Sequence, residues 1–367
     1  MKFVFTGYVR SSGFARPEDW LKRLAAYFGV LEALAGRHEV ISIEQIGYTG
    51  SMEQKGVQYR FMEFGTGRIL FFPFRLHRFI KHQKPDIVLV HGIEFPLQVL
   101  QLRWKLGKTV KILVQSHSNR IPGGYKALLQ RLADKHIDAY LFTSHTTGNA
   151  WADRQLIRDR RKIRELMVGS SVFIPADRKS ARDRLGIPQD ISLFLWAGRL
   201  DKNKDPMTVI KAFLRFVAQE QRAKLYFIYQ TNDLKAELEK YLRQHDATAA
   251  VTLVGKVEHE AMADWFSSAD YFISGSAKEV FGAAVVEAMS CGCIPILSDI
   301  PSFRRIVADG DCGFLFRQGS EDELLLQLQI AMETDTASLR EKIADHYRKN
   351  LSFQAIADRL EAICSEL

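Results

Sequence analysis

The sequence predicts an α/β fold built from two doubly wound domains, each a parallel sheet with helices on both faces. Short apolar segments of strand length alternate with helical stretches through most of the chain, and glycine or polar residues follow many of the strands. This alternation is typical of parallel sheets. The length of 367 residues is enough for about two domains of ordinary size.

The first half of the chain contains five apolar segments that we interpret as strands. These segments are Phe3–Phe5, His38–Ile43, Asp86–Val90, Val110–Val114 and Asp138–Thr143. We expect helices over Asp19–Ala35 and Arg75–His82, and Pro85 ends the second of these. The segment Ser51–Gly65 mixes polar and aromatic residues, which indicates an irregular loop or a hairpin.

A loss of periodicity between Ser170 and Asp190 indicates a linker, because Pro175, Gly186 and Pro188 interrupt the pattern there. We therefore expect one domain over residues 1–175, a second over 176–350 and a terminal helical segment over 351–367. Strands of the second domain are expected near Leu193, Leu225, Val251, Tyr271 and Ile294.

Charge is distributed unevenly between the two halves. Residues 1–175 carry 27 Lys and Arg against 14 Asp and Glu, a balance of +13. Residues 176–367 carry 24 against 29, a balance of −5, so the net charge is +8. The basic half indicates an anionic partner, either nucleic acid or a membrane surface with anionic lipids. No nucleic-acid recognition motif accompanies this charge, so nucleic acid is the less favoured partner.

The composition favours a cytoplasmic location. No apolar run of about 18 residues is present, so we expect no transmembrane helix, and the apolar N-terminal stretch is too short for a signal peptide. The four cysteines, Cys291, Cys293, Cys312 and Cys364, lack a C-x2-C spacing and suit free thiols in a reducing compartment. No metal-ligand cluster is visible, so we expect neither a metal nor another cofactor.

The segment from Ser276 to Leu297 carries the first functional signal. Glu279 and Glu287 stand on either side of a step, Phe281-Gly282, that should open a helix between two short buried strands. The turn before this helix would lie at the carboxyl ends of the strands, where open α/β sheets bind ligands. The backbone N–H groups that would then face a phosphate belong to Phe281, Gly282, Ala283 and Ala284. Two glutamates around a helix start also occur by chance, so a second signal is needed.

The segment Leu195–Asp205 supplies that second signal. An apolar strand ends at Gly198 and a helical pattern begins at Pro206, so Arg199 and Lys204 lie in the loop between them. An arginine offers a planar fork and a lysine a point charge, and the two together can neutralise a diphosphate. A solvated basic loop is the alternative, although Arg199 directly follows the strand.

Together the two segments resemble the retaining GT-B glycosyltransferases of family GT4. The matching residues are Gly198-Arg199-Leu200, Lys204, Glu279, Phe281-Gly282, Glu287-Ala288-Met289, Gly292, Pro295, Asp309-Gly310 and Gly313. The similarity is strong between Leu193 and Phe316 and weak before Ser192. The resemblance implies a GT-B fold, in which two Rossmann-like domains face each other across a cleft. It also implies an acceptor-binding N-terminal domain, a C-terminal domain that binds a nucleotide-sugar, and a last helix that returns to the N-terminal domain.

The resemblance also assigns roles to single residues. In the family an arginine and a lysine hold the donor diphosphate, which gives donor binding to Arg199 and Lys204. A first glutamate contacts the donor sugar near the reacting carbon, which makes Glu279 a catalytic candidate. A second glutamate holds the ribose hydroxyls, and Glu287 matches it.

Three histidines, His91, His117 and His145, each follow a predicted strand. His117 resembles the family's histidine near the donor sugar and is the second catalytic candidate, whereas His91 and His145 are interpreted as structural. The family often has a Gly-Gly loop after its first strand, which lets the backbone approach the donor phosphate. The stretch Gly7–Phe14 departs from that pattern and offers Gly13 for this donor-binding role.

The segment Arg68–His82 interleaves phenylalanines with basic residues. Such a segment fits a membrane interface, and it fits equally well a helix that buries its phenylalanines and exposes its arginines.

These observations favour transfer of a sugar from a nucleotide-diphosphate donor to a glycan or lipid-linked acceptor, with retention, in surface polysaccharide biosynthesis. We expect a cytoplasmic protein, peripheral at the inner membrane face. Two alternatives stay open: a nucleotide-sugar epimerase, and a non-catalytic GT-B binding subunit, which the departure at Gly7–Phe14 keeps in view. A nicotinamide-dependent dehydrogenase is disfavoured, because no G-x-G-x-x-G follows a predicted strand.

Overall fold

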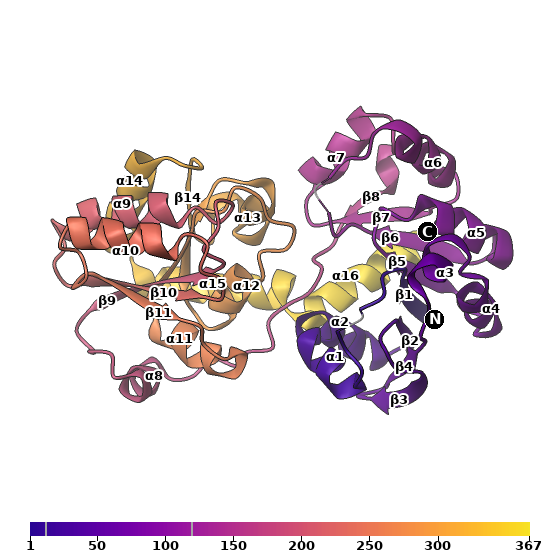
Figure 1. Ribbon diagram of the computed structural model, residues 1–367, viewed down its shortest axis with the longest axis horizontal. Coiled ribbons are helices and arrows are strands. Elements are labelled where there is room, and N and C mark those ends of the chain that lie inside the picture. Colours follow the sequence, from indigo (N-terminus) through magenta and orange to yellow (C-terminus); the bar gives the residue numbers. More distant parts are fainter. Residues whose placement is uncertain (12, 119) are drawn as a thin grey trace. The chain divides into compact units, whose positions relative to one another are not determined.

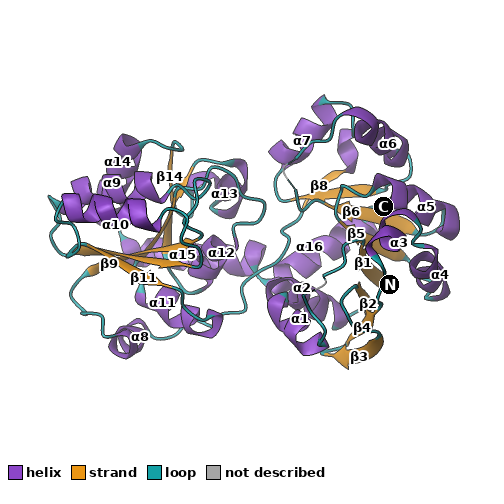
Figure 2. Cartoon of the chain, viewed as in Figure 1, coloured by secondary structure: helices purple, strands orange, loops and turns teal. Residues whose placement is uncertain are grey.

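The computed structural model describes residues 1–11, 13–118 and 120–367. The chain divides into two compact units, one of residues 1–170 with 353–367 and the other of residues 171–352 (Figure 1). Each unit contains one sheet with helices packed against it (Figure 2). The predicted α/β fold with two parallel sheets is therefore confirmed.

The N-terminal unit is built on an eight-stranded sheet in the order β3-β4-β2-β1-β5-β6-β7-β8. Its strands are β1 (Lys2–Gly7), β2 (Glu39–Glu44), β3 (Gly50–Gln54), β4 (Val57–Phe61), β5 (Ile87–His91), β6 (Lys111–Gln115), β7 (Ala139–Phe142) and β8 (Ile163–Glu165). Neighbouring strands pair in parallel except β3 and β4, which form an antiparallel hairpin at one edge. The segment predicted to be a loop or a hairpin is thus a hairpin.

Helices flank this sheet. They are α1 (Pro17–Arg23), α2 (Ala25–Ala35), α3 (Thr66–Phe71), α4 (Phe74–His82), α5 (Pro96–Leu106), α6 (Gly124–Asp134), α7 (His145–Asp153) and α16 (Phe353–Ser365). Although α16 is the last helix of the chain, it packs against α2 in this unit. The ring of Phe353 lies so close to Gly29 that a Cβ at Gly29 would be 2.5 Å from it, so this contact requires glycine.

The prediction of one helix over Asp19–Ala35 is wrong, because the structure has two. At Leu24 the backbone leaves the helical region, with φ −109° and ψ 21°, so α1 and α2 meet there at a bend. Leu24 lines a pocket at the carboxyl ends of the strands. The apolar pattern continues through Leu24, and only the tertiary packing shows the bend.

The C-terminal unit has a six-stranded parallel sheet in the order β11-β10-β9-β12-β13-β14. Its strands are β9 (Ser192–Gly198), β10 (Ala223–Tyr229), β11 (Val251–Gly255), β12 (Tyr271–Ser274), β13 (Ile294–Ser298) and β14 (Phe314–Phe316). Its helices are α8 (Arg178–Leu185), α9 (Pro206–Val217), α10 (Lys235–Gln244), α11 (Met262–Ser268), α12 (Ala283–Ser290), α13 (Pro301–Ile306), α14 (Glu321–Glu333) and α15 (Thr336–His346).

Three elements of the structure, β8 of the N-terminal unit and α8 and β14 of the C-terminal unit, are missing from the sequence-based prediction. The strands β8 and β14 are only three residues long, which is too short for a periodic signal. Helix α8 lies inside the expected linker. Its ends follow local capping rules, because the side chain of Asp177 accepts a hydrogen bond from the N–H of Ser180 and Gly186 adopts a left-handed conformation after the last turn.

Within the described part of the chain, none of the helices has both the length and the apolar character needed to cross a bilayer.

A buried ion cluster ties α8 to the sheet of the C-terminal unit. The guanidinium of Arg182 is fully buried and donates to the carboxylate of Asp270 at 2.8 Å and to the carbonyl of Ser268 at 2.9 Å. Arg178 and Arg340 contact the same carboxylate at 2.6 and 3.1 Å. A charge as buried as Arg182 is tolerated only when it is paired, so Asp270 is essential to this cluster.

We expect Asp270→Asn to lower the free energy of unfolding by about 3 kcal/mol or more, because Arg182 would stay buried without its counter-charge. Asp322→Asn is the matched control. Asp322 pairs with Arg215 at the surface with its side chain 84% exposed, and such pairs contribute at most about 1 kcal/mol. Urea unfolding followed by circular dichroism compares the two variants, and equal losses would contradict the assignment.

Candidate active site

The candidate residues of the C-terminal unit come together because β9 and β12 are neighbours in the sheet. Phe194 and Leu195 of β9 pair in parallel with Tyr271 and Phe272 of β12. The carboxyl ends of both strands therefore lie at the same edge. The loops that follow them carry Arg199 and Lys204 after β9, and Glu279 after β12, so residues about 80 positions apart share this edge.

An ion pair joins the two loops. The ammonium of Lys204 pairs with the carboxylate of Glu279, and both side chains are mostly buried, at 21% and 15% exposure. Two further hydrogen bonds of Asn203 support the pair. Its side-chain amide donates to the carbonyl of Lys278 at 3.1 Å, and its backbone carbonyl accepts from the N–H of Ala277 at 2.7 Å. Lys204, which is predicted to bind the diphosphate, and Glu279, the predicted catalytic glutamate, are thus in direct contact.

Arg199 lies in the same loop and pairs with a different carboxylate, that of Asp201. The distance is 3.0 Å, and the side chain of Arg199 is 61% exposed. Asp201 also accepts a hydrogen bond from the N–H of Lys204, at 3.0 Å. The carboxylate of Asp201 therefore connects the two basic residues of the loop.

The turn after Glu279 opens helix α12 at Gly282. Gly282 has φ 67° and ψ 46°, a left-handed conformation that suits glycine. A Cβ at this position would also lie 2.9 Å from the ring of Phe303. The N–H groups of Ala283 and Ala284 belong to the first turn and have no carbonyl partner within the helix, so they can bind an anion. Phe281 precedes this turn and is partly buried.

Glu287 lies a little more than one turn into α12. Its carboxylate is 3.5 Å from the Nε2 of His259, and its side chain is only 16% exposed. The ring of His259 in turn lies 4.8 Å from the ring of Phe173. His259 comes from the segment after β11, so Glu287 is held by a residue that the sequence analysis did not select.

The N-terminal unit has a pocket of about 360 Å³ at the carboxyl ends of β1, β2 and β5. Its lining residues include Gly7, Val9, Ser11, Tyr27, Glu44, His91 and His117. Gly13 is not among them, and Ser12 in the same loop lies outside the described residues. Other residues of the Gly7–Phe14 loop therefore form this wall.

A chain of hydrogen bonds runs along the wall of this pocket. The hydroxyl of Tyr27 lies 2.5 Å from the Nε2 of His91, and the Nδ1 of His91 lies 3.1 Å from the Nε2 of His117. The surrounding protein lowers the pKa of His91 well below its usual value and that of His117 to about 4. His117 keeps an accessible edge in the pocket. Both imidazoles are therefore uncharged at neutral pH, and each can donate one hydrogen bond and accept another.

Tyr27 and Glu44 also line the pocket, and the sequence analysis missed both. Glu44 is the last residue of β2 and accepts hydrogen bonds from the indole N–H of Trp20 at 2.8 Å and the hydroxyl of Ser42 at 2.6 Å. Removal from water raises the pKa of Glu44. Its position directly after a predicted strand was a usable signal, whereas nothing in the sequence marks Tyr27, which lies within a helix.

The described residues contain no group of three or more His, Cys, Asp or Glu side chains arranged to hold a metal ion.

Comparison with known proteins identifies the family of the C-terminal residues. Residues 177–350 match the family Glycosyl transferases group 1. A segment of 151 residues is 30% identical to D-inositol 3-phosphate glycosyltransferase 2 of Catenulispora acidiphila, covering 39% of this chain and 35% of that protein. A longer match, 24% identical over 288 residues, covers 76% of this chain and 68% of the GDP-mannose:cellobiosyl-diphosphopolyprenol alpha-mannosyltransferase of Xanthomonas campestris. The chain spans about a third of the length of the first relative.

The fold also matches solved structures along the whole chain. Anabaena HepE in complex with UDP aligns with a TM-score of 0.74 at 15% identity, covering 100% of both chains. A glycosyltransferase from Rickettsia africae aligns with a TM-score of 0.74, also at 15% identity, over 99% of this chain and 97% of that one. The fold is therefore GT-B, the fold of nucleotide-sugar glycosyltransferases. Residues 177–350 belong to the glycosyl transferase group 1 (GT4) family.

Gly282→Ala tests the left-handed start of α12. We expect a loss of about 2 kcal/mol or more in unfolding free energy. An alanine would be strained in the left-handed conformation, and its Cβ would clash with the ring of Phe303. Gly186→Ala is the control, since Gly186 has φ 65° with no atom within 4 Å of its Cβ position. It should cost only the backbone strain, about 1 kcal/mol. Urea unfolding compares the two, and a smaller loss for Gly282→Ala would contradict the packing argument.

The histidine pair should make the stability of the protein depend on pH. The pKa of His117 is about 4 in the folded state and about 6.5 in the unfolded state, and the pKa of His91 is lowered as well. The unfolded chain therefore binds more protons in this range, so stability falls as the pH drops from about 6.5 towards 4. The double variant His91→Asn/His117→Asn should lose less stability over that range.

The measurement is the urea midpoint at pH 7 and at pH 5, with His82→Asn at an exposed position as the control. The pKa of His77 is also lowered to about 4, but His77 contributes equally to all three proteins and cancels in the comparison. A double variant with the full pH dependence of the wild type would show that the pair is not responsible.

Proposed function

We propose that this protein transfers a sugar from a nucleoside-diphosphate donor to a glycan or lipid-linked saccharide, with retention at the anomeric carbon. The observation that carries this proposal is the contact between Lys204 and Glu279 beside the start of α12. It joins a cation, an acid and free backbone N–H groups at the edge where parallel sheets bind ligands. The family to which residues 177–350 belong supports the same reaction class.

The donor diphosphate is assigned to Lys204, Arg199 and the first turn of α12. When the bond between the sugar and the diphosphate breaks, negative charge grows on the leaving phosphate. Once the donor is bound, two cations and the N–H groups of Ala283 and Ala284 already point at the position where this charge develops, so they stabilise it. The diphosphate competes with Glu279 for Lys204 and with Asp201 for Arg199, so donor binding loosens both ion pairs.

Glu279 and Glu287 are assigned to different parts of the donor. Once Lys204 turns to the diphosphate, the carboxylate of Glu279 is available to orient the sugar and to stabilise positive charge at its reacting carbon. Glu287 lies further along α12 and accepts hydrogen bonds from the ribose hydroxyls, while His259 holds its carboxylate in place. Phe281 and Gly282 shape the turn between these two positions.

We assign acceptor binding to the N-terminal unit and a catalytic role to its His117. The neutral imidazole of His117 presents a donor or an acceptor to a sugar hydroxyl, and His91 and Tyr27 fix its orientation. Gly13 stays a candidate for approach to the donor phosphate. Two similar proteins indicate the range of substrates: one is named for a mannosyl donor and a diphosphopolyprenol acceptor, and HepE was solved with UDP-glucose. We therefore propose a UDP- or GDP-sugar donor and a role in surface polysaccharide biosynthesis.

The test is nucleotide-sugar turnover followed by NMR with a panel of UDP-, GDP- and ADP-sugars. Release of a nucleoside diphosphate from one donor is expected, and Lys204→Gln and Glu279→Gln should each lower the rate about 10²-fold or more. Lys202→Gln is the matched control, because Lys202 lies exposed in the same loop and should leave the rate unchanged.

Other outcomes separate the alternatives. Conversion of the donor to an isomeric sugar-nucleotide without release would identify an epimerase. Binding without release, also after addition of a membrane extract as an acceptor source, would indicate a binding subunit without turnover. Failure to bind any donor would refute the proposal.

A further inference from the structure

Helix α6 of the N-terminal unit presents its apolar side to solvent. Tyr125, Leu128 and Leu132 recur at a helical spacing and are 71%, 58% and 47% exposed. The opposite side of the helix is buried and carries two small apolar residues, Ala127 and Ala133, together with two polar ones, Gln130 and Asp134, which are 1% and 2% exposed. Both polar residues bond the hydroxyl of Tyr140, at 2.9 and 3.1 Å. The buried side fixes the orientation of α6, so its apolar side stays outside.

The neighbouring helices continue this apolar surface. The side chains of Phe71, Phe72 and Phe74, where α3 leads into α4, are 56%, 63% and 53% exposed, with ring centroids 6.5 and 6.1 Å apart in sequence order. Trp104 on α5 is 80% exposed and lines a hollow together with Phe74. Helix α5 packs against α4 on one side and α6 on the other. We call these four aromatic residues, with Tyr125, Leu128 and Leu132, the apolar face of α3–α6.

Seven of the large apolar side chains that the structure describes as exposed lie on this one face. Soluble proteins rarely gather so many on adjacent elements unless the surface binds something.

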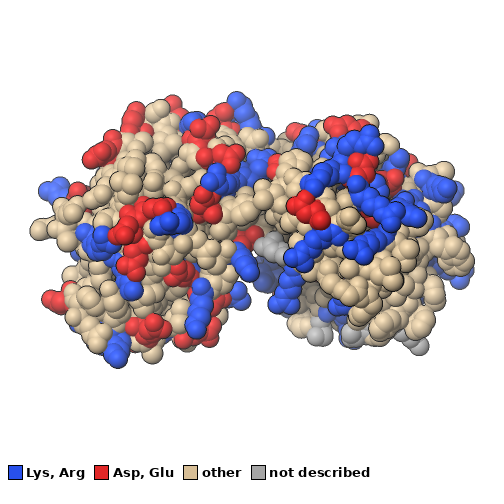
Figure 3. Space-filling model, turned by 90° about the horizontal axis from the view of Figure 1, so that it is seen from above, with Lys and Arg blue, Asp and Glu red and all other residues tan. Residues whose placement is uncertain are grey.

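The charges around the apolar face have one sign. Helices α3, α4 and α5 contain no Asp or Glu, and the single acid of α6 is the buried Asp134. Basic side chains stand among the apolar ones: Arg75, Arg78, Lys81, Lys105, Arg131 and Lys135. Figure 3 shows Lys and Arg gathered on the visible side of the N-terminal unit. The face is therefore cationic as well as apolar.

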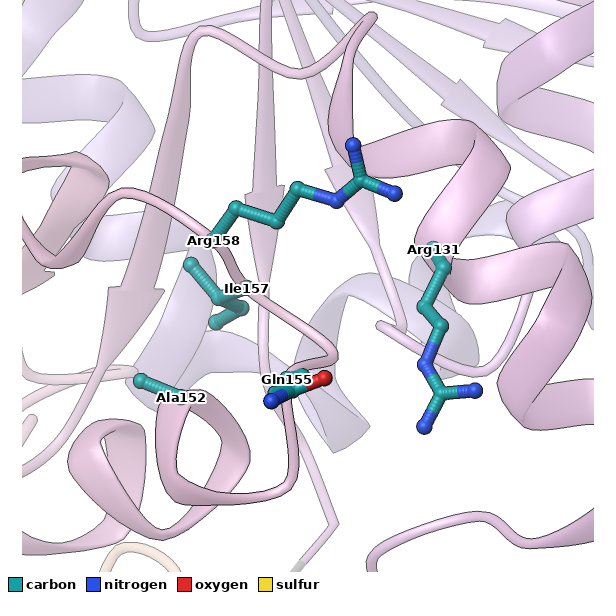
Figure 4. A pocket seen from close by; sticks show the side chains of 5 residues that line it. All are labelled: Arg131, Ala152, Gln155, Ile157 and Arg158. Carbon is teal, nitrogen blue, oxygen red and sulfur yellow. The ribbon is translucent and has the colours of Figure 1, made fainter.

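A pocket of about 350 Å³ adds to this cationic character. Arg131 projects into it from α6, and Gln155, Ile157 and Arg158 border it from the segment after α7 (Figure 4). The two arginines add positive charge beside Leu128 and Leu132 of α6.

We propose that the apolar face of α3–α6 docks on the interfacial region of a bilayer that contains anionic lipids. Tryptophan and tyrosine are favoured at the boundary between headgroups and acyl chains, and basic side chains are attracted to anionic headgroups. A second copy of the chain fits less well, because two-fold packing would bring the cationic surroundings of one copy against those of the other. The proposal does not depend on sugar transfer, since docking needs neither donor nor acceptor.

The experiment is co-sedimentation of the full chain with vesicles of phosphatidylcholine alone or with added phosphatidylglycerol. The wild type should bind the anionic vesicles at least about tenfold better than the neutral ones and should be released by salt. The variant Trp104→Ser/Leu128→Ser/Leu132→Ser should lose at least about tenfold in binding to the anionic vesicles. Leu326→Ser/Ile330→Ser is the control, since these side chains are 51% and 39% exposed on α14 of the other unit.

A charge variant provides a second test that leaves the apolar residues in place. Arg131→Gln/Lys135→Gln should weaken binding to anionic vesicles about fivefold for each cation removed and should change binding to neutral vesicles little. All substitutions are at exposed positions, and circular dichroism checks that the variants are folded.

The outcomes are decisive in either direction. Equal binding by the triple variant and the wild type, or binding of the wild type to neither type of vesicle, would overturn the proposal. A concentration-dependent dimer of the wild type that the triple variant lacks, without vesicle binding, would assign the face to a second copy instead.

Discussion

The parallel pairing of β9 with β12 is the constraint on which the candidate site depends. Lys204 and Glu279 are 75 residues apart in the chain, and they meet because the strands before them end at the same edge of the sheet. The backbone carbonyl of Asn203, which accepts from the N–H of Ala277, and its side-chain amide, which donates to the carbonyl of Lys278, then hold the two loops together. The ion pair compensates two charges that are mostly buried. A loss of register between the strands would separate the cation from the acid.

In the N-terminal unit the carboxyl ends of parallel strands also surround a site, but the histidines there are neutral. The strands β1, β2 and β5 end around one pocket, where removal from water lowers the pKa of both histidines and raises that of Glu44. At physiological pH a neutral histidine pair can donate and accept hydrogen bonds along the pocket wall without adding charge. The C-terminal site works through full charges and this pocket through hydrogen bonds, which suits recognition of a diphosphate by one and of sugar hydroxyls by the other.

The outer helices of the N-terminal unit bury some polar side chains and expose some apolar ones. Helix α6 buries Gln130 and Asp134 because the hydroxyl of Tyr140 satisfies both. Its leucines are then left on the surface, where they join the aromatic residues of α3–α5. In the segment Arg68–His82, Leu76 and Ile80 enter the core, whereas Phe71, Phe72 and Phe74 stay exposed. The interpretation that this helix buries its phenylalanines is therefore wrong for these three residues, and the membrane interface stays a prediction.

The sequence by itself determined the class of fold and the family of residues 177–350, and its motifs predict the chemistry of the C-terminal site. Strand-helix alternation is local, and the turn at Phe281-Gly282 and the loop at Gly198 have signatures within a few residues. Only the tertiary structure decided the bend at Leu24, the partnership of Glu287 with His259 and the grouping of Tyr27, Glu44, His91 and His117 around one pocket. Such contacts join residues far apart in the chain. Strand order and packing fix them, and neither leaves a periodic trace in the sequence.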